Sequence, residues 1–208
     1  MLDACDRPAP LLAAAGLTPA DLRGWLSPLG EHWWGSPGMT TLSHGDPAPT
    51  NNYLGTHGAR LLDFEYAVPR HRLFDLAQWA TRCPLPAPAF AQLRARHEQL
   101  IVAANGACPD ADAFRWALER SCVVSAAYML TWLPTHRLLD GDLPWADGWR
   151  ARAAILHALS VIEDAGRNTD LETASAFAST LSGALRRRWP DVAATGPQWY
   201  GLASSATT

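Results

Sequence analysis

The chain of 208 residues contains no lysine, so its basic character comes entirely from arginine. Acidic residues outnumber basic ones, which gives a formal net charge of −3 and a pI near 6.1. A protein with this balance of charge has no general attraction to nucleic acid or to an anionic membrane surface. We therefore expect neither nucleic acid nor a membrane among its partners.

Cysteines and long apolar runs are also scarce. The four cysteines lie far apart and form no C-x-x-C pair, so their spacing indicates neither a metal site nor a disulfide framework. The first residues, MLDACDRPAP, lack the basic start and the apolar centre of a signal peptide. No apolar run approaches the ~18 residues that a membrane-spanning helix needs. These absences predict a soluble, cytoplasmic protein with reduced thiols.

The composition is that of a globular protein, with 48% hydrophobic and 18% charged residues. This length suffices for one well-buried domain or for two small ones. Residues 1–16 are rich in proline and alanine, and we expect them to be loosely ordered, as we expect residues 201–208 to be disordered. Thr18 followed by Pro19 is typical of an N-cap with proline at the first helical position, and it predicts a helix over Pro19–Leu26.

Short strands are predicted within residues 39–82. The predicted strands are, in order, Met39–Ser43, Asn52–Gly55 and Arg60–Phe64. The last two flank a small polar tip, residues 56–59, as in a β-hairpin. A loop containing proline is expected over Val68–Arg72, and a short helix over Phe74–Thr81.

Helices are predicted to dominate residues 86–190, where apolar residues recur at three-to-four spacing. The predicted helices are Ala87–Ala104, Ala111–Leu139, Trp149–Asp164 and Leu171–Arg188. The last one closes with three arginines, residues 186–188. Three cations in a last turn suit the helix dipole, and a nucleic-acid patch is the alternative interpretation.

The strongest functional signal lies in residues 43–65, which read SHGDPAPTNNYLGTHGARLLDFE. Phosphoryl transfer needs a carboxylate beside the attacking hydroxyl and hard oxygen ligands for magnesium. Kinases supply the carboxylate and one ligand from a loop with the pattern H-x-D-x-x-x-x-N, and a second ligand from an Asp-Phe motif one hairpin later. Here His44, Asp46 and Asn51 match the loop pattern. Asp63, with the phenylalanine that follows it, matches the second motif.

With these motifs the segment resembles the C-terminal lobe of the aminoglycoside phosphotransferase and choline kinase branch of the protein-kinase-like superfamily. That branch is similar in having HGD or HND in the loop and DFE or DWE in the metal motif. The resemblance covers motifs from about Leu42 to Trp79 and continues as a matching run of helices. It implies an α+β, mostly α fold: a single C-lobe over residues 1–208, with a small β-hairpin at the catalytic loop and a helical subdomain.

The resemblance implies an ATP-dependent phosphotransferase that moves a phosphoryl group to a hydroxyl of a small, amine-containing molecule. Asp46 would be the catalytic base or orient the hydroxyl, and Asn51 and Asp63 would hold Mg²⁺, with ATP as co-substrate. No residue is assigned to the nucleotide itself. From the residues alone, the alternatives are that Asp46 caps the turn before Pro47, that Asn51 satisfies backbone groups of the loop, and that Asp63 ends a strand.

Other side chains near these motifs have structural roles among their alternatives. We expect His44 to be a buried histidine that orients the loop, and Asp75 to be a helix cap or a carboxylate that braces the loop. Glu65 could face solvent, a metal-bound water or the substrate. The candidates for a pocket that receives a cationic amine are Trp132, Trp145, Trp149, Asp140, Asp142 and Asp147. Core packing of the tryptophans and a solvated loop for the aspartates are the alternatives.

A kinase of this type also has an N-terminal lobe with a glycine-rich loop and a lysine that pairs with phosphate. Only 43 residues precede His44, whereas such a lobe needs roughly 60–70. These residues are predicted to be helix and loop, they contain no G-x-G-x-x-G, and arginine is not a geometric equivalent of lysine. The N-lobe is thus expected to be absent from this sequence, lost or supplied by a separate N-lobe or partner chain. The alternatives are a truncated, non-catalytic remnant that binds nucleotide, metal or protein, and an unrelated helical protein.

Overall fold

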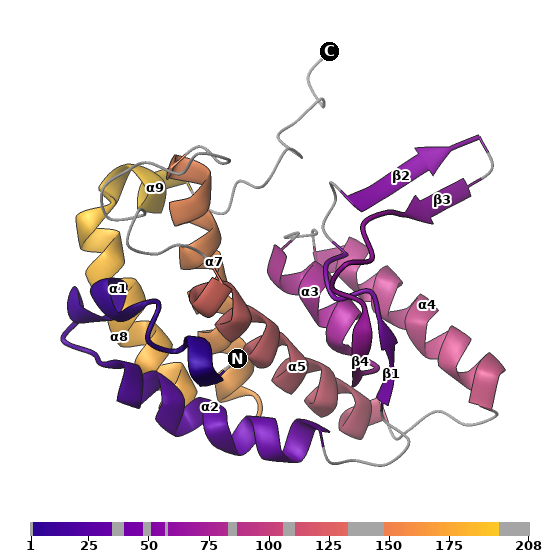
Figure 1. The fold of residues 1–208 in the computed structure, drawn as a ribbon, viewed down its shortest axis with the longest axis horizontal. Helices are drawn as coiled ribbons and strands as arrows, with labels where there is room; N and C mark the ends of the chain where they lie inside the picture. Colours follow the sequence, from indigo (N-terminus) through magenta and orange to yellow (C-terminus); the bar gives the residue numbers. More distant parts are fainter. Residues whose placement is uncertain are drawn as a thin grey trace.

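The structure, a computed structural model, describes residues 2–34, 40–47, 51–56, 58–82, 87–105, 111–132 and 148–195. Over these residues the fold is a mostly helical α+β arrangement with two small antiparallel sheets. In Figure 1 the strands lie on the same side of the molecule as α3 (Phe74–Arg82) and α4 (Ala87–Asn105), and the first and last helices lie on the other side. No helix within the described ranges has the length and apolarity that a membrane crossing requires.

The first long helix is α2 (Pro19–Trp34), and its start has the predicted cap. The Asp21 N–H donates to Thr18 Oγ1 (3.4 Å), and the Asp21 carboxylate accepts the Thr18 N–H (2.7 Å). This reciprocal pair satisfies two backbone groups at the helix start. The helix continues past the predicted end at Leu26, because Leu29 extends the buried apolar face by another turn.

Residues 1–16 differ from the expectation of loose order. They include a 3-10 turn (Leu2–Ala4) and helix α1 (Ala9–Ala13). Cys5 and both leucines of α1 are fully buried in the core. The expectation followed from proline and alanine content, which does not reveal whether a leucine pair reaches the core.

Two pairs of antiparallel strands form the two sheets. β2 (Asn52–Gly55) and β3 (Gly58–Leu61) make the predicted hairpin. β1 (Thr40–Ser43) pairs with β4 (Val68–His71), so the chain between them leaves and re-enters the same sheet. This pairing brings the segment that follows the Asp-Phe motif back beside the strand that precedes the HGD sequence.

Strand β4 corrects the prediction of a loop over Val68–Arg72. Pro69 lies opposite Leu42 in this sheet. Each strand of a two-stranded sheet has an open edge, so a proline there does not have to donate a ladder hydrogen bond. Strand β3 also ends before its predicted boundary, because Asp63 has φ 63°, a left-handed conformation that an extended strand does not contain.

The core is built mainly from α5 (Ala111–Trp132), α7 (Gly148–Arg167) and α8 (Glu172–Arg188). Helix α7 packs between α5 and α8, while α3 packs on α5 and α2 packs on α8 (Figure 1). The short helix α9 (Pro190–Thr195) closes the described chain. The predicted helices agree closely with these bounds. The part of the predicted third helix beyond residue 132, and residues 201–208, lie outside the described residues.

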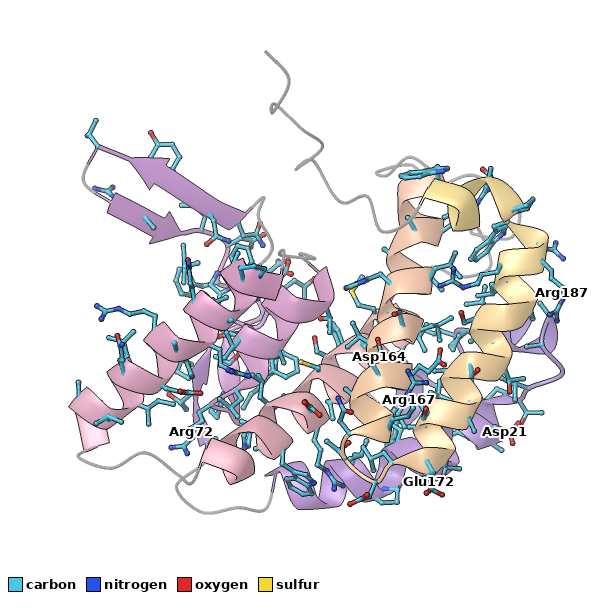
Figure 2. The ribbon with its side chains drawn as sticks, turned by 180° about the vertical axis from the view of Figure 1, so that it is seen from behind. Asp21, Arg72, Asp164, Arg167, Glu172 and Arg187 are labelled. Atoms are coloured by element: carbon cyan, nitrogen blue, oxygen red, sulfur yellow. The ribbon has the colours of Figure 1, made fainter. Side chains whose placement is uncertain are left out.

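Charges at the two ends of α8 match the direction of its dipole. Glu172 lies in the first turn and Arg187 in the last, at opposite ends of the helix in Figure 2. A carboxylate at the positive end and cations at the negative end each contribute about 0.3–1 kcal/mol. The arginine-rich end therefore has a structural explanation that needs no nucleic acid.

Candidate active site

The HGD loop, defined here as residues 43–47, follows β1 and is held by the first turn of α3. The Asp75 carboxylate accepts hydrogen bonds from Ser43 Oγ (2.7 Å), the His44 N–H (2.8 Å) and the Gly45 N–H (3.0 Å). Hydrogen bonds to a charged group are worth about 1.5–3 kcal/mol each. This geometry confirms that Asp75 braces the loop, one of the two roles predicted for it.

His44 is a buried residue of the HGD loop, and both of its ring nitrogens form hydrogen bonds. Nε2 lies 2.8 Å from the Leu62 carbonyl oxygen, and Nδ1 accepts the Asp46 N–H at 3.3 Å. Because Nδ1 accepts, Nε2 is the nitrogen that carries the proton in the neutral ring. The ring also lies 4.6 Å from that of Phe64. The prediction of a buried histidine that orients the loop is confirmed.

Asp46 and Asn51 are in direct contact. Asn51 Nδ2 donates to the backbone oxygen of Asp46 (2.9 Å) and to its carboxylate oxygen Oδ2 (3.0 Å). Both residues are half-buried. Since the amide nitrogen faces Asp46, the amide oxygen is the atom of Asn51 suited to a cation. The contact also agrees with the alternative that Asn51 satisfies groups of the loop.

Asp63 is joined to the same loop through its neighbour Leu62. The Leu62 N–H donates to the Asn51 carbonyl (2.8 Å), and the Leu62 carbonyl accepts from His44 Nε2 (2.8 Å). These two bonds hold the backbone of Leu62, the residue directly before Asp63. The side chain of Asp63 is exposed. Asp63 follows the last residue of β3 by two positions, so its place in the chain also agrees with the alternative that it ends a strand.

Asn51 and Asp63 offer only hard oxygen donors, which are the ligands that Mg²⁺ prefers. Magnesium commonly combines one or two such protein ligands with water and phosphate oxygens. Within the part of the chain that the structure describes, no group of three or more His, Cys, Asp or Glu residues could hold a metal ion.

Two of the remaining candidates, Glu65 and Trp149, lie within the described residues. Glu65 is exposed and lies beside Tyr66, where the negative charge of Glu65 raises the pKa of the phenol. Trp149 is half-buried and packs against the core, as its structural alternative predicted. The side chain of Trp132 and the other pocket candidates lie outside the described residues: Trp145, Asp140, Asp142 and Asp147.

Gln78 contacts the HGD loop and was not anticipated from the sequence. It is fully buried on α3, and its Nε2 donates to the Gly45 carbonyl at 2.9 Å. The sequence held one signal, because Gln78 follows Phe74 by one helical turn and so falls on the buried face of the predicted helix. A polar side chain at such a position needs a hydrogen-bond partner.

Comparison with known proteins assigns no family to this chain. No protein-family model matches it, and a search of the curated proteins found no match. Support for a function of this chain therefore comes from the geometry of the HGD loop and from the motifs of residues 42–79.

Proposed function

We propose that this chain is the C-lobe of a kinase-like phosphotransferase, which moves the γ-phosphoryl group of ATP to a hydroxyl of a small, amine-containing acceptor. The observation that carries the proposal is the contact between Asp46 and Asn51 in a loop braced by Asp75. Phosphoryl transfer depends on such positioning of a carboxylate beside a metal ligand. The resemblance to aminoglycoside phosphotransferases and choline kinases supports the same reaction and the kinase-like fold.

In the proposed reaction the acceptor hydroxyl donates a hydrogen bond to the Asp46 carboxylate. Its oxygen forms a bond to the γ-phosphorus, while the bond from that phosphorus to the bridging oxygen breaks and ADP leaves. The hydroxyl proton passes to Asp46. Asn51 keeps the carboxylate aimed at the acceptor. Asn51 and Asp63 would hold Mg²⁺, which would neutralise charge on the phosphates when bound.

The segment that contains the candidate site exposes many apolar side chains. Those between residues 42 and 68 are Leu42, Tyr53, Leu61, Leu62, Phe64, Tyr66 and Val68. Exposed apolar patches are typical of interaction surfaces. We infer that a separate N-lobe or partner chain covers this surface and brings a cation for the phosphates. The carboxylates of Asp46 and Asp63 give the surface a charge complementary to such a partner.

We place this activity in the cytoplasm, where ATP is available. Cys122 is a free thiol buried in the core, which agrees with a compartment that keeps thiols reduced. The proposed partners of the site are then ATP, the small-molecule acceptor and the second lobe.

Replacing Asp46 by alanine tests the enzyme proposal. Transfer from γ-labelled ATP to amino alcohols is measured with Mg²⁺ present, and we expect the variant to be about 10²-fold slower or more. Asp6→Ala is the matched control, because Asp6 is an exposed carboxylate that pairs with Arg23 (2.9 Å) on α2. It should keep the native rate. Equal rates for the native chain and Asp46→Ala would refute the proposal that this chain by itself is an active enzyme.

Replacing Asp63 by alanine distinguishes catalysis from binding alone. If the native chain binds ATP only when Mg²⁺ is present, turns over none of it, and loses binding in Asp63→Ala, the remnant interpretation is favoured. Turnover that appears only after a lysine-bearing lobe is added would instead favour the proposed partner.

A further inference from the structure

Gln78 is the one fully buried amide side chain among the described residues that contacts the HGD loop. Its Nε2 donates to the Gly45 carbonyl, whereas its Oε1 is buried with no hydrogen-bond partner. A buried acceptor without a partner is unfavourable, because it has lost its hydrogen bonds to water and gained none in return. A leucine or methionine would fill the same space without that cost, so packing alone does not explain an amide here.

The Gly45 carbonyl belongs to the peptide unit that precedes the Cα atom of Asp46. Peptide units are planar, so fixing the oxygen and the N–H of one unit fixes the plane. Gln78 holds the oxygen, and His44 Nδ1 accepts the Asp46 N–H at 3.3 Å. The direction in which the chain enters Asp46 is thus set from both sides.

The N–H of Gly45 is also held by α3, the helix that carries Gln78. The Gly45 N–H donates to Asp75, which lies three residues before Gln78 and so faces the same way from α3. Helix α3 is itself fixed to α5, because Thr81 Oγ1 and Ser125 Oγ form a buried hydrogen bond of 2.8 Å. Helix α3 therefore connects the HGD loop, which contains Asp46, to the helical core.

We propose that Gln78 is a positioning residue, which orients the Asp46 carboxylate by holding the Gly45 carbonyl. This role rests on the proposed function insofar as it concerns catalysis. The hydrogen bond itself is a property of the folded chain and can be tested without turnover.

Gln78→Met keeps the size of the side chain and removes the donor. Displacement of a catalytic group by about 1 Å costs up to about 10²-fold, so we expect kcat to fall by about 10- to 100-fold with KM unchanged. Thr169→Val is the matched control, because Thr169 is equally buried and its hydroxyl donates to the Ala165 carbonyl (2.7 Å) at the end of α7, not to α3 or the loop. It should lower stability without lowering kcat.

Gln78→Glu supplies a signature that a purely structural role would not give. A protonated carboxyl can donate to the Gly45 carbonyl, whereas an ionised one repels it, and burial favours the protonated form. We expect the rate of this variant, relative to that of Gln78→Met, to increase as the pH is lowered. A rate for Gln78→Glu no higher than that for Gln78→Met at the lowest pH assayed would contradict the proposal.

The outcomes separate this proposal from the proposed function. If Asp46→Ala is inactive while Gln78→Met keeps the native kcat, the positioning role is wrong and the enzyme proposal stands. If the native chain shows no rate that depends on Asp46, the readout becomes amide hydrogen exchange of Asp46 followed by NMR. Faster exchange in Gln78→Met but not in Thr169→Val then supports the positioning role, and unchanged exchange refutes it.

Discussion

At the scale of single residues, Gly45 is tightly constrained by its surroundings. It has φ +83°, and a Cβ atom added there would collide with the Arg70 guanidinium and the Tyr66 carbonyl. Arg70 cannot move aside freely, because its guanidinium lies over the Phe74 ring at 4.8 Å. Only glycine combines this backbone conformation with so close an approach.

We expect Gly45→Ala to lower the free energy of unfolding by about 1–3 kcal/mol, since a residue with a side chain is strained at positive φ. Gly24→Ala is the matched control, because Gly24 lies in α2 with nothing within 4 Å of an added Cβ. That change should raise stability by roughly 0.5–1 kcal/mol. Urea unfolding measures both. A Gly45→Ala variant as stable as the native chain would contradict the geometry.

His71 gives the folded chain a dependence on pH. It is buried at the end of β4, and burial lowers its pKa to about 4, with a smaller contribution from the charge of Arg72. In the unfolded chain the pKa of histidine is about 6.5. Between these values the unfolded chain binds more protons, so stability increases with pH. This contribution is complete above about pH 6.5 and is lost as the pH falls toward 4.

Replacing His71 by asparagine removes the titrating ring while leaving a side chain that can accept the Leu73 N–H, which now bonds to Nδ1 at 3.3 Å. We expect the melting temperature of this variant to fall less between about pH 7 and about pH 4.5 than that of the native chain. The comparison uses the change in melting temperature between the two pH values. A variant that melts at a lower temperature at both pH values therefore does not affect the result. The same change in melting temperature for the native chain and for the variant would show that His71 is not the source of the pH dependence.

At the scale of elements, the β2–β3 hairpin and the helices differ in how they are supported. The hairpin projects from the rest of the molecule in Figure 1, and every residue of β3 is exposed. A two-stranded hairpin is marginally stable in water by itself. Helix α7, in contrast, contributes the fully buried side chains of Ile155, Leu159 and Ile162.

We expect amide hydrogens of the hairpin to exchange much faster than those of α7, whose exchange should require global unfolding. Exchange measured by mass spectrometry on peptides from the two segments tests this difference. Equal protection of both segments would mean that the hairpin is held by contacts that its exposure does not suggest.

At the scale of the whole molecule, the beginning and the end of the described chain meet. Trp25 of α2 lies 5.5 Å from Phe177 of α8, measured between ring centroids. Helix α2 thus belongs to the helical body, at the opposite side of the molecule from the hairpin in Figure 1. The buried leucines of α1 and α2 therefore stabilise the helical body, which lies away from the hairpin.

Much of the local structure followed from the sequence. Three-to-four spacing of apolar residues placed the long helices, and Thr18 with Pro19 located the start of α2, because these signals depend only on neighbours within a turn or two. The order of His44, Asp46 and Asn51 located the candidate site for the same reason. Their chemical roles stay predictions that the variants above test.

Tertiary structure alone decided how the site is held. Asp75 could have been a helix cap or a brace, and it braces the loop because the fold brings His44, 31 residues earlier, within 2.8 Å. Gln78 reaches Gly45 across 33 residues, and β4 forms because β1 lies beside it. Local patterns record which face of an element is apolar, but not which distant segment it will meet. The sequence by itself therefore determined the elements and the order of the candidate residues, and packing between distant segments determined their geometry.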